Sequence, residues 1–145
     1  MSLKIIRTYL DTGVLIRAFQ VGAKNEDRAS DIINDSNREF IVSDILKLEL
    51  IPKATFHKQK DEVAFYEAFF ENAILSVEIS PALIAKAIDL ASEYDLAPCD
   101  ALHLSAAIEA QADEFITTEK PTKPFFQVPK LDFQIISLYV PPSKH

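Results

Sequence analysis

Acidic residues follow two apolar runs of the sequence at the point where each run ends. Asp11 comes directly after Ile5–Leu10, and Glu119 comes two residues after Glu114–Thr117. If both runs are strands of a parallel sheet, their carboxyl ends lie at the same edge, where α/β proteins bind ligands. Acids that converge there can hold a divalent cation, which inverts the local charge and can receive a phosphate.

Two further acids occur in apolar surroundings on predicted helices. Glu49 is embedded in ILKLELI and Asp100 in LAPCDALHL, where a lone carboxylate is costly to bury without a partner. Each acid also has a local explanation, since Asp11 can cap a helix and Asp100 can interact favourably with a helix N-terminus. Glu49 can be a solvated helix residue and Glu119 a turn residue. Taken singly these explanations are favoured, whereas taken together the four acids favour a shared site.

The elements that must position these acids alternate along the chain. Apolar runs and helical periodicity predict strands at Ile5–Leu10, Glu39–Ser43, Ile74–Ile79, Glu114–Thr117 and Gln134–Val140. The predicted helices are Gly13–Phe19, Glu26–Ile33, Asp44–Leu50, Phe56–Asn72, Ala82–Tyr94 and Pro98–Ala110. Pro52 is expected to end the third of these helices. We therefore predict one three-layer α/β/α domain over residues 1–145, with a five-stranded, mainly parallel central sheet.

Composition excludes several other classes of protein. The 145 residues are 48% hydrophobic and include one cysteine, Cys99, which predicts a core without disulfides and a reducing, cytoplasmic location. No apolar run is long enough to span a bilayer. Two glycines cannot form a Gly-rich phosphate loop, so no nucleotide cofactor is expected, and the three histidines lack zinc-ligand spacing. The net charge of −7 argues against nucleic-acid binding by bulk electrostatics.

The segments YLDTGVLI, SDILKLELI, APCDALHLSAAI and FITTEKP resemble the PIN-domain family of metal-dependent nucleases over nearly the whole chain. The resemblance implies a single-strand-directed ribonuclease, as in VapC-type toxins, with RNA as substrate and an antitoxin protein as a partner. It places one or two Mg²⁺ or Mn²⁺ ions in a cluster of four acids, Asp11, Glu49, Asp100 and Glu119. Thr12 and Thr118 would support that cluster. Because Mg²⁺ takes few carboxylates directly, Asp11 and Asp100 are expected to bind the metal and the two glutamates to orient water or a second ion.

Two positions depart from the family's pattern. Gly13 stands where Asn is common and removes a side chain that would orient Asp11, and Glu119 stands where Asp is common. The alternative is therefore a non-catalytic nucleic-acid-binding module with a degenerate acidic site. Two other α/β classes fit less well. A haloacid-dehalogenase-like phosphatase would need a second Asp at position 13, and a phosphoacceptor receiver would need paired acids at the end of the first strand.

Basic residues near the acids are the candidates for contacting RNA, although lysine runs are more often solvated surface. The candidates are Lys53, His57, Lys58, Lys120 and Lys123. A stripe of aromatic residues at helical spacing is predicted to be core, with a homodimer contact as the alternative. The stripe consists of Phe65, Tyr66, Phe69 and Phe70.

Overall fold

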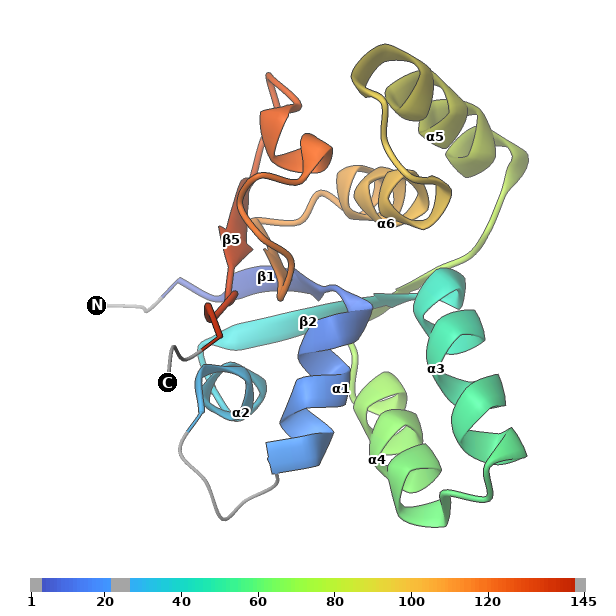
Figure 1. The fold of residues 1–145 in the computed structure, drawn as a ribbon, viewed down its shortest axis with the longest axis vertical. Coiled ribbons are helices and arrows are strands. Elements are labelled where there is room, and N and C mark those ends of the chain that lie inside the picture. The colour runs from blue at the N-terminus through green and yellow to red at the C-terminus, as the bar shows by residue number, and fades with distance from the viewer. Residues whose placement is uncertain (1–3, 22–26, 143–145) are drawn as a thin grey trace.

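A five-stranded parallel sheet forms the centre of the molecule (Figure 1). The computed structural model describes residues 4–21 and 27–142. The strands are β1 (Ile6–Leu10), β2 (Arg38–Ser43), β3 (Leu75–Val77), β4 (Glu114–Thr117) and β5 (Gln134–Ser137), in the order β3-β2-β1-β4-β5. Every neighbouring pair is parallel. The predicted α/β fold is confirmed, and β1 occupies the middle of the sheet.

Helices cover both faces of this sheet. They are α1 (Thr12–Val21), α2 (Arg28–Ile33), α3 (Asp44–Phe56), α4 (Lys60–Glu71), α5 (Pro81–Tyr94), α6 (Pro98–Glu109) and the short 3₁₀ helix η2 (Pro124–Gln127). In Figure 1, α5 and α6 lie on one side, while α1, α2 and α4 lie on the other, with α3 beside α4. No helix in the described ranges is long and apolar enough to cross a membrane.

Pro52 does not end α3, contrary to the sequence-based expectation. The helix continues through it to Phe56. A proline inside a helix removes the N–H that would bond to the carbonyl four residues earlier, here that of Leu48. Both residues face solvent, and Leu48 is 68% exposed. Water can therefore hydrate that carbonyl, and the helix tolerates the proline.

Other boundaries differ by a few residues. The predicted helix Phe56–Asn72 is divided, because the chain turns between α3 and α4 with Lys58 in the left-handed region at φ 57°. The predicted strand Ile74–Ile79 shortens to β3. The predicted start of the second helix, Glu26, lies outside the described residues. These differences leave the order of strands and helices unchanged.

The aromatic stripe on α4 contributes to the core, as predicted. Tyr66 is fully buried, and its hydroxyl donates to Glu62 at 2.6 Å. Phe65, Phe69 and Phe70 are partly buried and pack against the core cluster. The homodimer contact stays a prediction.

Candidate functional site

Asp11 lies at the carboxyl end of β1 and is tied to the neighbouring strand. Its Oδ2 accepts a hydrogen bond from the Thr117 hydroxyl at 2.9 Å, and its Oδ1 accepts from the Thr12 backbone N–H at 2.7 Å. The backbone N–H of Asp11 donates to the Ile116 carbonyl at 2.9 Å. The contact with Thr117 joins β1 to β4, so Asp11 has a role beyond the start of α1. Its carboxylate is fixed in orientation and only 12% exposed.

Glu49, on α3, lies close to Asp11 and contacts the residues around it. Its Oε1 accepts from the Thr12 hydroxyl at 2.8 Å and from His103 Nε2. The same His103 nitrogen lies 3.8 Å from Asp11 Oδ1. The hydrogen bond from His103 lowers the pKa of Glu49 below its ordinary value, and partial burial opposes that effect. Glu49 is therefore not a solvated helix residue but a partner of the group around Asp11.

His103 belongs to a buried chain of polar side chains that begins at the N-cap of α3. Ser43 Oγ accepts from the Leu46 N–H at 3.2 Å and lies 2.7 Å from the Tyr9 hydroxyl, which lies 2.6 Å from His103 Nδ1. One arrangement of protons satisfies all of these groups. Ser43 donates to Tyr9, Tyr9 donates to Nδ1 of a neutral ring, and Nε2–H donates to Glu49. Complete burial raises the pKa of Tyr9 well above its ordinary value.

The predicted site did not include His103, which was considered only for zinc-ligand spacing. The available clue was its position three residues after Asp100 on one predicted helix. Residues at this spacing share a helix face. His103 is 2% exposed, so it lies between α6 and the sheet rather than on the surface.

Asp100 and Glu119 share a lysine. Lys123 Nζ lies 3.6 Å from Asp100 Oδ2 and 3.9 Å from Glu119 Oε2. Burial raises the pKa of Asp100 above its ordinary value, the charge of Asp11 adds to this effect, and Lys123 acts against it. Lys123, which the sequence suggested as an RNA contact, is thus directed at the acids in this structure.

The four acids form two groups at the carboxyl edge of the sheet, Asp11 with Glu49 and Asp100 with Glu119. Cys99 is exposed at the start of α6, and partial burial, followed by the charges of Glu49, Asp100 and Asp11, raises the pKa of its thiol. Within residues 4–21 and 27–142, however, no three His, Cys, Asp or Glu side chains are arranged to hold a metal ion. The donor chemistry fits Mg²⁺ or Mn²⁺, since all four side chains offer hard carboxylate oxygens. In the arrangement seen, His103 and Lys123 are the basic groups next to these oxygens, and Thr12 and Thr117 donate hydrogen bonds to them.

Two hollows adjoin the acids and contain most of the predicted RNA-contacting residues. A hollow of about 370 Å³ reaches Glu49 and is lined by Lys53 and His57. Another of about 350 Å³ is lined in part by Thr118, Glu119, Lys120 and Lys123. Lys58 is exposed in the turn after α3. Lys53 and His57 thus lie near Glu49, and Lys120 and Lys123 lie near Glu119.

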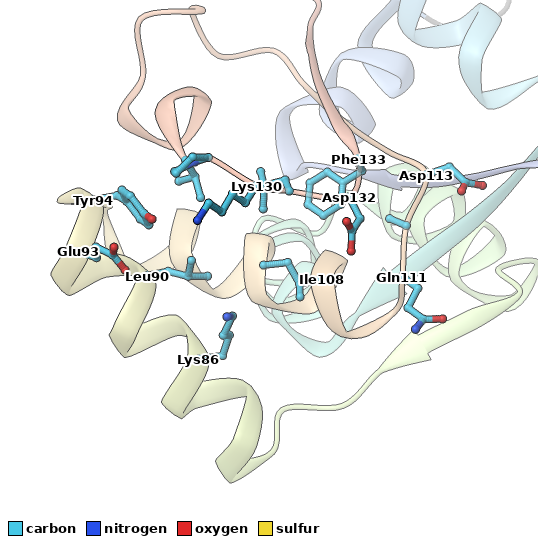
Figure 2. A pocket seen from close by; sticks show the side chains of 14 residues that line it. Lys86, Leu90, Glu93, Tyr94, Ile108, Gln111, Asp113, Lys130, Asp132 and Phe133 are labelled. Atoms are coloured by element: carbon cyan, nitrogen blue, oxygen red, sulfur yellow. The ribbon is translucent and has the colours of Figure 1, made fainter.

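A hollow of about 450 Å³ lies at the opposite edge of the sheet (Figure 2). Its lining includes Asp113 and Phe133, which come just before β4 and β5, together with Lys86 and Ile108 from the helices. The acids follow the strands, whereas this hollow adjoins their amino ends. It is therefore separate from the acidic site.

Gly13 packs directly against Thr118. A Cβ atom at position 13 would lie 2.2 Å from Thr118 Oγ1. Thr118 therefore occupies the space that a side chain at position 13 would need. The carboxylate of Asp11 is oriented by Thr12 and Thr117 instead.

Comparisons with known proteins agree with this fold. The family model described as "PIN domain" matches residues 8–121. Similar solved structures include VapBC2 from Rickettsia felis bound to a DNA fragment from its promoter, at 18% identity and a TM-score of 0.69, covering 91% of this chain and 98% of that chain. DNA-bound VapBC from Salmonella typhimurium has 17% identity and a TM-score of 0.69, covering 92% and 99%. A toxin–antitoxin complex from Klebsiella pneumoniae has 21% identity and a TM-score of 0.64, covering 91% and 98%. Among curated protein sequences, none matches the chain significantly.

The close approach of Gly13 and Thr118 predicts the cost of a side chain at position 13. Gly13→Ala should lower the free energy of unfolding by about 1–3 kcal/mol, because the added methyl group overpacks against Thr118. The double variant Gly13→Ala/Thr118→Ala should lose less than Gly13→Ala alone, since the obstructing hydroxyl is gone. Urea unfolding of the four proteins in this cycle measures both effects. An equal loss from Gly13→Ala in both backgrounds would show that Thr118 is not the obstacle.

The buried chain through His103 predicts a second stability effect. His103→Leu removes one hydrogen-bond partner from the buried Tyr9 hydroxyl and one from Glu49, and it should lower the free energy of unfolding by about 2–4 kcal/mol at pH 7. The matched control is His57→Leu, which removes an exposed histidine and should change stability by no more than about 0.5 kcal/mol. Chemical unfolding followed by circular dichroism compares the two. Similar losses in both variants would contradict the structural role of His103.

Proposed function

Because the chain belongs to the PIN-domain family, we propose that it is a divalent-metal-dependent endoribonuclease that hydrolyses RNA phosphodiester bonds. The proposed catalytic and metal-binding residues are Asp11, Glu49, Asp100 and Glu119. The observation that carries this proposal is the contact of Thr12 and His103 with both Asp11 and Glu49 at the carboxyl edge of the sheet. Asp11 follows β1 directly, and Thr12, Glu49 and His103 come from α1, α3 and α6, so elements far apart in the sequence contribute to this contact.

In this proposal Asp11 and Asp100 would hold a Mg²⁺ or Mn²⁺ ion, with Glu49 and Glu119 orienting its water molecules. A bound ion of this kind lowers the pKa of coordinated water and polarises the phosphate. The chain's own residues would position the reacting groups. Thr12 and Thr117 fix the Asp11 carboxylate, and His103 fixes Glu49 by a hydrogen bond from a buried ring. Such prior orientation supports catalysis because no side chain needs to be ordered during the reaction.

We further propose that single-stranded RNA lies along the carboxyl edge and crosses both hollows. Lys53 and His57 would contact phosphates on one side of the acids and Lys120 on the other. Lys120 Nζ lies 5.5 Å from the centre of the Tyr139 ring, so a cation and an aromatic surface are combined there. Proteins that bind single strands commonly combine these two features. Local basic residues of this kind can operate in a chain whose net charge is −7.

The similar solved structures are toxin–antitoxin complexes, which supports a proposal that this chain is a toxin with a protein antitoxin as its partner. The cell's cytoplasm would be the place of both the RNA and the partner. The alternative function, a nucleic-acid-binding module without hydrolysis, is favoured by the ion pairs that Lys123 forms with Asp100 and Glu119. An activity measurement separates the two.

Asp11→Asn should reduce RNA cleavage in Mg²⁺ or Mn²⁺ by at least about 100-fold, because it removes a charge that stabilises the reacting groups while keeping the side-chain shape. The matched control is Asp89→Asn, the same chemical change at an exposed position of α5, which should cleave like the wild type. Gel analysis of labelled single-stranded RNA measures the rates. A wild-type protein that cleaves no RNA in either metal would favour the binding module.

Expression of the wild-type chain in a bacterial host should arrest growth if the protein is a toxic ribonuclease. Asp11→Asn should abolish the arrest and Asp89→Asn should retain it, since only the first variant removes a site carboxylate. Growth curves at matched protein levels measure the effect. Arrest that persists in Asp11→Asn would mean that toxicity does not come from the acidic site.

A further inference from the structure

The Lys123 ammonium group is the one movable cation that an ion pair joins to the acids in the described part of the chain. Its Nζ lies between Asp100 Oδ2 and Glu119 Oε2, at 3.6 Å and 3.9 Å. The side chain is 37% exposed, so water reaches it from one side. By contrast, His103 is 2% exposed and is held by Tyr9 and Glu49 at its two ring nitrogens. His103 cannot leave the site without opening the core, whereas Lys123 can.

The backbone that carries Lys123 is held in place. Its N–H donates to the Lys120 carbonyl at 3.0 Å, and its carbonyl accepts from the Phe126 N–H at 3.0 Å. Two residues further on, Phe125 is 1% exposed and packs edge-on against Phe115, with ring centres 5.8 Å apart. These contacts fix the backbone at position 123, and the lysine side chain extends from there to the acids. Only the flexible side chain has freedom to move.

Space for such a movement exists next to the acids. The hollow of about 350 Å³ beside Glu119 is lined by Lys123 itself and by Thr122, Pro124 and Tyr139. An ammonium group that leaves Asp100 can enter this hollow and stay hydrated. The lysine stem is long enough to swing without any change in the backbone.

We propose that Lys123 is a built-in counter-ion for Asp100 and Glu119, which a divalent cation must displace in order to bind these acids. The proposal rests on the proposed function, since it concerns the same acidic site. An ammonium group and a divalent cation on the same two carboxylates repel each other strongly over a few ångströms. Lys123 therefore lowers the affinity of the site for the metal ion and sets the metal concentration at which the site fills.

Calorimetric titration of the full chain with Mn²⁺ tests this directly. Lys123→Met keeps the length and apolar stem of the side chain but removes its charge, and it should bind Mn²⁺ at least about ten-fold more tightly than the wild type. Lys123→Arg keeps the charge and should bind as weakly as the wild type. Lys86→Met makes the same change at the opposite edge of the sheet and should leave the affinity unchanged. Because Lys123 is partly exposed, these variants should fold, which circular dichroism checks.

The outcomes separate this inference from the proposed function. If Asp11→Asn abolishes Mn²⁺ binding while Lys123→Met binds as the wild type does, the inference is wrong and the proposed metal site stands. Weaker binding by Lys123→Met would also overturn it, because the lysine would then be supporting the metal ligands. If no variant binds Mn²⁺ at all, both proposals are wrong. Tighter binding in Lys123→Met, with Lys123→Arg and Lys86→Met unchanged, supports the counter-ion.

Discussion

Carboxylates gathered at the edge of an apolar sheet repel one another, so each one needs a hydrogen-bond donor or a cation close by. In this protein two of these partners are donors from another element. Thr117 on β4 donates to Asp11, which follows β1, and His103 on α6 donates to Glu49 on α3. The pairing of β1 with β4 and the packing of α6 over the sheet are therefore conditions for the site as well as for the core.

Stability and site geometry are joined through one residue in the middle of the sheet. The Tyr9 ring stacks on Phe115 with centres 5.4 Å apart, and its hydroxyl contacts both Ser43 and His103. Ser43 also caps α3, the helix that carries Glu49. The position of Glu49 thus depends on the start of its own helix and on a histidine from another. A buried network of this kind fixes one arrangement because each unpaired member would be costly.

The two departures from the family pattern have different physical consequences. At position 13 the missing side chain leaves space that Thr118 fills, and neighbouring threonines orient Asp11. At position 119 the longer glutamate side chain meets Lys123. The first departure is compensated within the fold. The second places Glu119, like Asp100, beside the Lys123 ammonium group. In the proposed counter-ion role, this charge would raise the metal concentration at which the site fills.

The sequence alone determined the order of strands and helices and marked four acids as candidates for a site, because apolar periodicity and the neighbours of a residue along the chain are local properties. The prediction that Pro52 ends its helix was wrong, since tolerance of a proline depends on whether that part of the helix faces water. The contact of His103 with Glu49 and the pairing of Lys123 with Asp100 were not predicted, because no local pattern in the sequence marks these partners. Only the tertiary structure decided these contacts, since the partners are 54 and 23 residues away in the chain and meet only when α6, α3 and the loop after β4 pack at one edge of the sheet.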